Sequence, residues 1–192
     1  MASNTKLSKS QPSEKNGCRT EKKGGKMKEM DYLSVAGEAM RKIRKGAFLT
    51  VRAADAQNTM TIGWAMFGVI WQKPVLMVAV RKTRHTFGLM EKASDFTVSV
   101  PSGDMSRETA FCGTQSGRDV DKFKMCGLKT SSGLHVASPV IHAPGIHIEC
   151  KKIYQSALNP ADLDPGLDQA IYPKQDYHTL YFGEILACYE TG

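Results

Sequence analysis

The chain has 192 residues, of which 41% are hydrophobic and 23% are charged, and this balance is typical of a single globular domain. It contains no run of about 18 apolar residues, which argues against a transmembrane helix, and no apolar segment like that of a signal peptide. Five cysteines, an odd number without a C-x-x-C pair, are typical of a reducing compartment. We therefore expect a cytoplasmic protein without a disulfide framework.

The net charge of +7 is concentrated near the N-terminus. Residues 1–26 hold seven Lys/Arg and two Glu, which leaves 19 basic and 17 acidic residues for the remainder. This segment has almost no apolar side chains, so we predict a disordered basic tail, and Met27 and Met30 leave open whether it belongs to the natural chain. The nearly neutral remainder, residues 27–192, is predicted to be the folded domain and gives little electrostatic support for a nucleic-acid partner.

The domain begins with a pattern typical of one helix followed by strands. Apolar residues at helical spacing predict a helix over residues 31–45, ended by Gly46. Two β-rich segments, residues 47–53 and 60–67, predict strands separated by a turn at 54–58.

The rest of the chain continues mainly with strands. The predicted elements are a strand at 75–80, a helix capped by Thr83 that runs to about residue 92, a strand at 96–100, short helices at 102–113 and 119–125, and strands at 146–154 and 178–189. A loop rich in Pro and Asp, residues 159–174, is predicted to be an exposed excursion. Several strands without regular βαβ alternation indicate a mainly β fold, a small antiparallel barrel with helices packed outside.

Two neighbouring segments have the chemistry of a ligand site. Residues 81–86, RKTRHT, combine cations and hydroxyls with a predicted helix N-terminus, which suits a phosphate dianion; a solvated cationic turn is the alternative. Residues 58–64, NTMTIGW, offer strand backbone, a small glycine and an aromatic neighbour to a heteroaromatic ring. A glycine bulge with Trp64 in the core explains that segment equally well.

A third segment, residues 112–123, is a polar loop that could hydrogen-bond ligand oxygens. Its GTQSG sequence matches neither the G-x-S-x-G nucleophile elbow nor a phosphate-binding P-loop, which disfavours hydrolase and NTPase chemistry. Cys112 is a packing residue or, less well supported, a reactive thiol. His142, His147 and Cys150 match no familiar zinc spacing, so we expect no metal site.

Five sequence blocks in order carry a resemblance to a known family. They are N-x-MTIGWAMFGVIWQKPV, VRKTRHT, FTVSVP, FCGTQSGRDVDKF and YHTLYFGEI, and the resemblance covers about residues 32–189. They resemble the flavin reductase-like, FMN-binding split-barrel family, and most closely its flavoredoxin branch. The resemblance implies an antiparallel Greek-key split β-barrel that forms a homodimer, with one non-covalent FMN per subunit near the dimer interface.

The resemblance also assigns binding roles by position. It implies that the isoalloxazine and ribityl groups are lined by Asn58, Met60, Thr61, Ile62 and Trp64. It implies that the phosphate is held by Arg81, Arg84, His85 and Thr86, with Lys82 as a weaker candidate. It implies a loop closing over the flavin with Cys112, Gly113, Ser116, Gly117 and Lys122, where the Lys122 charge could favour a reduced, anionic ring.

These implications predict an FMN-dependent oxidoreductase, a flavoprotein in which electrons pass from NADH, NADPH or a redox partner through FMN to free flavin, a small acceptor or another protein. No side chain is predicted to be a chemical catalyst, because the cofactor supplies the electron chemistry. Two other hypotheses remain open: a single-stranded nucleic-acid binder that stacks bases on Trp64 and Trp71, and a passive flavin storage or sensing protein.

Overall fold

The computed structural model describes residues 27–192, and the predicted basic tail at 1–26 lies outside them. The strands are β1 (Lys28–Glu29), β2 (Ala47–Ala53), β3 (Ala56–Ile62), β4 (Ala65–Ile70), β5 (Lys73–Arg81), β6 (Asp95–Pro101), β7 (Thr130–Ser131), β8 (Val140–Ile141), β9 (Gly145–Ala157) and β10 (His178–Thr191). The helices are α1 (Tyr32–Ile43), α2 (His85–Lys92), α3 (Ser106–Thr114), α4 (Lys122–Met125) and α5 (Pro165–Ile171), with a 3₁₀ turn at Pro160–Asp162.

One antiparallel sheet organises the described chain. Its strand order is β3-β2-β6-β9-β10-β5-β4, with β1 added beside β10, and β7 and β8 form a separate pair. The two edge strands, β3 and β4, are consecutive in the chain and are joined only by Gly63 and Trp64. The sheet must therefore curl until its edges meet at this link, which is how one sheet becomes a barrel.

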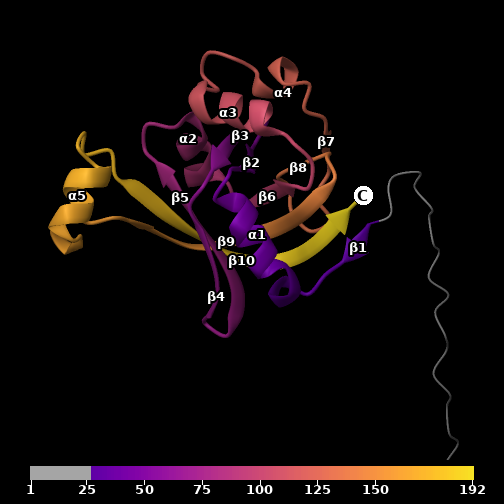
Figure 1. The fold of residues 1–192 in the computed structure, drawn as a ribbon, viewed down its shortest axis with the longest axis horizontal. Helices are drawn as coiled ribbons and strands as arrows, with labels where there is room; N and C mark the ends of the chain where they lie inside the picture. Colours follow the sequence, from indigo (N-terminus) through magenta and orange to yellow (C-terminus); the bar gives the residue numbers. More distant parts are fainter. Residues whose placement is uncertain (1–26) are drawn as a thin grey trace, which may run out of the picture.

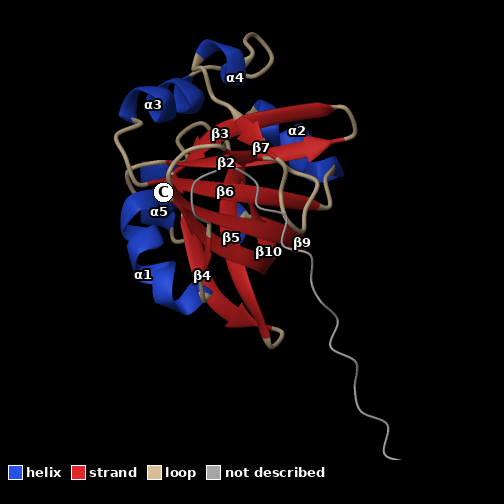
Figure 2. Ribbon diagram, turned by 90° about the vertical axis from the view of Figure 1, so that its right-hand side faces the viewer, coloured by secondary structure: helices blue, strands red, loops and turns tan. Residues whose placement is uncertain are grey.

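Helices lie around the outside of the curled sheet. Figure 2 shows α1, α3 and α4 outside the strands, and Figure 1 shows α5 projecting from the body between β9 and β10. α1 follows the sequence pattern closely: the Asp31 carboxylate accepts a hydrogen bond from the Leu33 N–H at 3.0 Å, and Val35, Ala39 and Ile43 are buried at helical spacing. Gly46, with a φ of 119°, then turns the chain into β2.

The core fills the interior of the barrel with aliphatic side chains from the sheet and from α1 and α2. Gly183 lies at a point of close packing in it. A Cβ there would lie 2.6 Å from both Phe96 and Cys150 side-chain atoms, so only glycine lets β10 pass over them. The strand register shifts between Phe182 and Gly183, as expected at such an approach.

Several local predictions were wrong in informative ways. The single strand expected at 60–67 is two strands, β3 and β4, because Gly63 and Trp64 leave the ladder. The strand β3 already begins at Ala56, inside the predicted turn. Thr83 does not cap α2: Arg84 is the cap position without a side-chain hydrogen bond, and the Thr83 hydroxyl donates to Asp176 at 2.7 Å.

The remaining differences concern the ends of elements and short pieces. α3 and α4 begin later than predicted, at Ser106 and Lys122, after turns in which Asp104 and Asp121 accept hydrogen bonds from backbone N–H groups. The predicted excursion at 159–174 contains α5. Tyr172, which follows α5 directly, has a buried side chain, so the excursion is not wholly exposed. The two-residue strands β1, β7 and β8 are too short to leave a periodic signal.

Candidate functional site

Two hollows adjoin at the link between the edge strands. The first, which we call the Trp64 hollow, has a volume of about 260 Å³ and is lined by Met60, Thr61, Ile62, Gly63, Trp64, Ala79, Arg81, Arg84 and His178. The second, the Thr86 hollow, has a volume of about 120 Å³ and is lined by Met60, Thr83, Arg84, His85, Thr86, Thr114, Gln115, Ser116, Gly117, Arg118 and Lys122. Because Met60 and Arg84 border both, the two hollows are neighbours.

The Trp64 hollow is apolar on one side and cationic on the other. Met60 and Ile62 are buried at the end of β3, whereas Trp64 is 46% exposed and lies against the His178 ring with centroids 4.5 Å apart. Arg81 ends β5, and its direct partner across the sheet is His178, the first residue of β10. A flat molecule with polar edges fits these surroundings.

The Thr86 hollow is held together by short contacts between distant segments. The Asn58 amide donates to the Thr86 hydroxyl at 2.8 Å. Gly117 lies so close to Asn58 and His85 that a Cβ there would be 2.5 Å from the Asn58 side-chain oxygen and 2.8 Å from the His85 ring. The loop after α3 therefore has to pass as bare backbone over the end of β3 and the start of α2.

Thr61 connects the same loop region to the Trp64 hollow. Its hydroxyl donates to the Thr109 carbonyl in α3 at 2.5 Å, and a Cβ on Gly113 would lie 3.3 Å from its own Cβ. These contacts fix α3 against the edge strand. The edge strand, the turn before α2 and the loop after α3 are thus brought together, although 50 residues or more separate the first from the last.

The two arginines differ in how far the protein already uses their N–H groups. Arg81 donates to the backbone carbonyls of Asp176 at 2.8 Å and Ile171 at 3.2 Å, and it lies 5.1 Å from the Tyr172 ring centroid. Arg84 donates to the Gly113 carbonyl at 2.9 Å. Arg84 borders both hollows, so it has the freer guanidinium and the more central position for an anion.

Lys122 is an unusual cation because its side chain is buried. Its ammonium donates to the Cys112 carbonyl at 2.7 Å, and burial is the main reason that its pKa is lowered. It borders the Thr86 hollow and not the Trp64 hollow. Its charge therefore acts at the end of the site where Thr86 and Ser116 lie.

Not every predicted residue reaches a hollow. Lys82 is exposed and lines neither one, and Cys112 is buried in a small apolar cluster with Phe48, Leu128 and Ile141. Burial, with Cys126 nearby, raises the pKa of Cys112 to about 12, so its thiol is protonated at neutral pH. Lys82 and Cys112, and likewise the predicted Asn58 and Gly113, border neither hollow.

Four further residues line the hollows that were not among the predicted cofactor-binding residues. His178, Thr83, Gln115 and Arg118 line the hollows, and the Arg118 guanidinium donates to the Thr83 carbonyl at 3.0 Å. Arg118 lay within a quoted block, so its charge beside the cationic turn was a usable signal. His178 lay within another of those blocks, YHTLYFGEI, but it gave no such charge signal, because it looked like the first residue of an ordinary strand.

His178 and His85 are both kept from protonation by their surroundings. Burial first, and then the charge of Arg81, lowers the pKa of His178 to about 4. Burial and the charges of Arg118 and Lys122 lower the pKa of His85. Both imidazoles are therefore neutral at physiological pH, and each can donate one hydrogen bond from one ring nitrogen and accept another at the other nitrogen.

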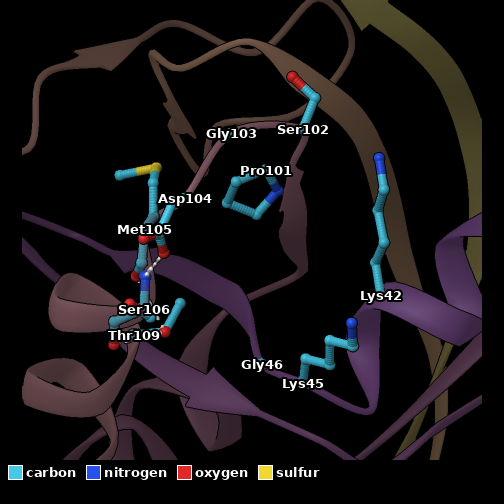
Figure 3. A pocket seen from close by; sticks show the side chains of 10 residues that line it. All are labelled: Lys42, Lys45, Gly46, Pro101, Ser102, Gly103, Asp104, Met105, Ser106 and Thr109. Carbon is cyan, nitrogen blue, oxygen red and sulfur yellow. Dashed lines mark hydrogen bonds between the residues drawn. The ribbon is translucent and has the colours of Figure 1, made fainter.

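Other hollows have less convergent chemistry. Figure 3 shows one of about 330 Å³ between the C-terminal end of α1 and the turn before α3, where Lys42 and Lys45 face Pro101 and Ser102. Lys42 is already paired with Glu38 at 2.7 Å. Another, of about 470 Å³, lies beside His142 and Tyr189. Across residues 27–192, no group of three or more His, Cys, Asp or Glu side chains is placed to hold a metal ion, and no helix could span a membrane.

The curled antiparallel sheet, with helices at its periphery and edge strands that meet at a ligand-sized hollow, defines a split β-barrel. Residues 40–192 match the model of the flavin reductase like domain, and the chain belongs to that family. This confirms the fold class and the family resemblance. The FMN-binding character of that family applies to the chain at this coarse level, and the detailed activity does not follow from it.

Three solved structures illustrate the likeness. Flavoredoxin of Desulfovibrio vulgaris (Miyazaki F) is 26% identical with a TM-score of 0.60, over 77% of this chain and 69% of that one. Flavoredoxin from Methanosarcina acetivorans is 25% identical with a TM-score of 0.58, over 76% and 67%. An FMN-binding domain of a flavin reductases-like enzyme from Shewanella baltica OS155 has a TM-score of 0.63 over 88% and 78%, and at 18% identity it supports the fold alone.

The names of the similar sequences give no activity. The uncharacterized protein YddH of Escherichia coli (strain K12) is 28% identical over 78% of this chain and 72% of its own length. Uncharacterized proteins of Archaeoglobus fulgidus and Pyrococcus abyssi are 25% and 29% identical, over 72% and 69% of this chain. The chain spans about two thirds of the length of those two relatives, 68% and 66%.

Proposed function

We propose that this protein is an FMN-dependent oxidoreductase that binds one flavin mononucleotide across the Trp64 and Thr86 hollows. The single observation that carries the proposal is that the two hollows share Met60 and Arg84. One molecule with a flat ring and an anionic tail would match the chemistry of both. The family match supports the same ligand.

The residues present fit the ring of a flavin. Trp64 and Ile62 offer apolar surface, and Gly63 leaves the backbone approachable where the chain departs from the ladder. The polar rim of the ring would meet backbone groups at this end of β3. We assign Asn58 an indirect part, because its amide holds the Thr86 hydroxyl in place.

The residues of the Thr86 hollow fit a phosphate. Arg84 and Arg118 supply guanidinium N–H groups, Thr86 and Ser116 supply hydroxyls, and α2 begins at His85 with its first-turn N–H groups near the hollow. Gly117 keeps the loop as bare backbone, so it leaves space that a side chain would fill. In this proposal Arg81 supports the Trp64 end of the site, and Lys82 and Cys112 make no contact with the cofactor.

Bound FMN would supply the electron transfer, taking electrons from NADH, NADPH or a redox partner and delivering them to free flavin or another acceptor. The protein's own residues bind and orient FMN, and they exclude water from it. Lys122 places a buried positive charge beside the Thr86 hollow, which favours negative charge on a ligand there. No side chain in this proposal is a chemical catalyst.

A second copy of the chain is part of the proposal. The β4–β5 hairpin and the neighbouring face of β9 expose large apolar side chains, including Val69, Trp71 and Tyr154, which are 67%, 53% and 49% exposed. Trp71 contacts Tyr154 and Phe182 edge-on, so these rings form one patch. Contiguous exposed apolar surface of this kind is typical of an interface, which supports a homodimer. A reducing, cytoplasmic location agrees with the free thiols of Cys112, Cys126, Cys150 and Cys188.

The phosphate assignment can be tested by comparing FMN with riboflavin, which has the same ring and no phosphate. We expect Arg84→Ala to weaken FMN binding by roughly 10- to 150-fold, the range for a charge-assisted contact, and to leave riboflavin binding nearly unchanged. Arg52→Ala is the matched control, because Arg52 bonds Gln57 on an exposed part of β2. Equal losses for both flavins would contradict the phosphate assignment.

Electron transfer is separated from passive flavin storage by rapid mixing. FMN-loaded protein should lose its visible flavin absorbance on mixing with NADH, NADPH or reduced ferredoxin, with one donor much faster than the others. A protein that binds FMN and is reduced rapidly by none of the three would support storage and contradict the enzymatic part of the proposal.

A further inference from the structure

Tyr172, at the end of the α5 excursion, contacts the His178 side chain from behind the Trp64 hollow. The Tyr172 hydroxyl lies 2.8 Å from His178 Nδ1, and both side chains are buried. The excursion is held to the barrel by Arg81, which donates to the Ile171 and Asp176 carbonyls on either side of Tyr172. This loop therefore reaches the edge of the candidate site despite projecting from the body in Figure 1.

The direction of the Tyr172–His178 hydrogen bond follows because the phenol proton has no other acceptor within residues 27–192. Burial raises the pKa of Tyr172, so the phenol keeps its proton, and within residues 27–192 the only hydrogen-bond partner of that hydroxyl is His178 Nδ1. The phenol hydrogen is then left to point at Nδ1. A neutral imidazole that accepts a hydrogen bond at Nδ1 carries its own N–H hydrogen on Nε2.

His178 is neutral because of the groups that face it. Burial is the main cause that lowers its pKa to about 4, and Arg81 and Arg84 add to this effect while Asp176 opposes it. Within residues 27–192, His178 Nε2 has no hydrogen-bond partner. Every buried side-chain nitrogen or oxygen in that range has a partner, so Nε2 is not one of the buried atoms. Nε2 is therefore accessible, and the open space that His178 borders is the Trp64 hollow.

We propose that Tyr172 is a positioning residue that fixes His178 as the Nε2–H tautomer, so that His178 donates one directed hydrogen bond to an acceptor atom on the edge of the ring in the Trp64 hollow. Trp64 holds the imidazole by lying against its face, with centroids 4.5 Å apart. The identity of the ring as a flavin rests on the proposed function, whereas the tautomer does not.

The tautomer can be read directly from protein labelled with ¹⁵N at histidine. A long-range ¹H–¹⁵N correlation spectrum of the full chain distinguishes the two neutral forms, and His178→Gln identifies the signals. We expect His178 to be the Nε2–H form at pH 7, with and without FMN. Tyr172→Phe should convert it to a mixture, because the phenol that selects Nδ1 as acceptor is gone.

FMN affinity supplies the second readout. Tyr172→Phe should weaken FMN binding by roughly 2- to 12-fold, the range for one neutral hydrogen bond. His178→Leu should weaken it at least as much, and His178→Gln, which retains a side-chain donor, should recover part of the loss. Tyr177→Phe is the matched control, because Tyr177 lies against Tyr172 but its hydroxyl donates to Asp168 instead.

The Nδ1–H tautomer in the wild-type protein would overturn the inference. So would a Tyr172→Phe variant that matches Tyr177→Phe in both tautomer and FMN affinity. A wild-type protein that binds no flavin after reconstitution would overturn the proposed function, and the spectrum would still decide whether Tyr172 sets the tautomer of His178.

Discussion

His147 and His178 show how two buried histidines can have opposite uses in one protein. Both have a pKa lowered to about 4, mainly by burial. His147 Nδ1 contacts the Ser99 hydroxyl at 3.1 Å, and its Nε2 contacts the Ala143 carbonyl at 3.0 Å and the Thr191 hydroxyl at 2.9 Å. His178 uses only Nδ1, for Tyr172.

The difference lies in hydrogen-bonding capacity left over after folding. Around His147 the polar groups satisfy one another, and nearby Glu149 accepts from the backbone N–H groups of Leu134 and His135 and from the Tyr189 hydroxyl. Around the Trp64 and Thr86 hollows, His178 and Arg84 keep donors that no group within residues 27–192 takes up. Burial and a shifted pKa therefore mark both regions, and spare donors mark only the candidate site.

The largest effect that would test this comparison is on folding. Glu149→Gln would place an amide NH₂ or a weaker acceptor against two backbone N–H groups in a fully buried site. We expect the free energy of unfolding to fall by about 2–4 kcal/mol, with FMN affinity unchanged in the folded fraction. Denaturant unfolding and FMN titration measure the two quantities, and a selective loss of FMN binding would erase the distinction between the regions.

Replacement of Gly117 at the candidate site should instead weaken FMN binding. In Gly117→Ala, the new Cβ would lie 2.5 Å from the Asn58 side-chain oxygen, so Asn58 or the loop must move. Overpacking of this kind costs about 1–2 kcal/mol, which corresponds to an FMN affinity weaker by roughly 5- to 30-fold. Gly88→Ala is the control, since a Cβ there meets nothing within 4 Å. Equal FMN affinity in both variants would show that the loop does not border the cofactor.

The response to acid should come partly from His147. Its pKa is about 4 in the folded protein and near 6.5 when unfolded, so its neutral form contributes stability that is complete above pH 6.5 and is lost as the pH falls toward 4. His147→Gln removes this titrating imidazole. The fall of the unfolding free energy with decreasing pH should then be shallower, by up to about 1.4 kcal/mol per pH unit. Denaturation curves between pH 4 and 7 give the slopes, and an unchanged slope would remove His147 as a contributor.

The smallest effect is expected at Cys112. Its buried thiol is protonated and borders neither hollow, so Cys112→Ser should change FMN affinity by no more than about twofold. FMN titration measures the affinity, and steady-state reduction with the preferred donor measures the activity. Loss of activity with flavin still bound would mean that the thiol takes part in the reaction.

The sequence was most informative where one local pattern decides the structure. The helix α1 follows from Asp31 and its apolar spacing, and β2 has the predicted bounds. The break between β3 and β4 was missed because Gly63 and Trp64 sit inside a continuous β-rich run, and only the closure of the sheet shows that they form its seam.

Prediction of the candidate site shows the same limit. The cationic turn and the strand before Trp64 could be recognised as binding segments, because each has its chemistry within a few residues. His178 depends on Tyr172, Trp64 and Arg81, which come from three separate parts of the chain. No spacing in the sequence indicates that these four side chains meet.

A crystal structure of the protein with FMN is the most direct test of the central claim, that one ligand bridges the two hollows. The account predicts the ring beside Trp64 and His178 and the phosphate within hydrogen-bond distance of Arg84 and Thr86. FMN bound elsewhere, such as in the hollow beside Lys42 and Lys45, or with its phosphate at the Trp64 end, would contradict it.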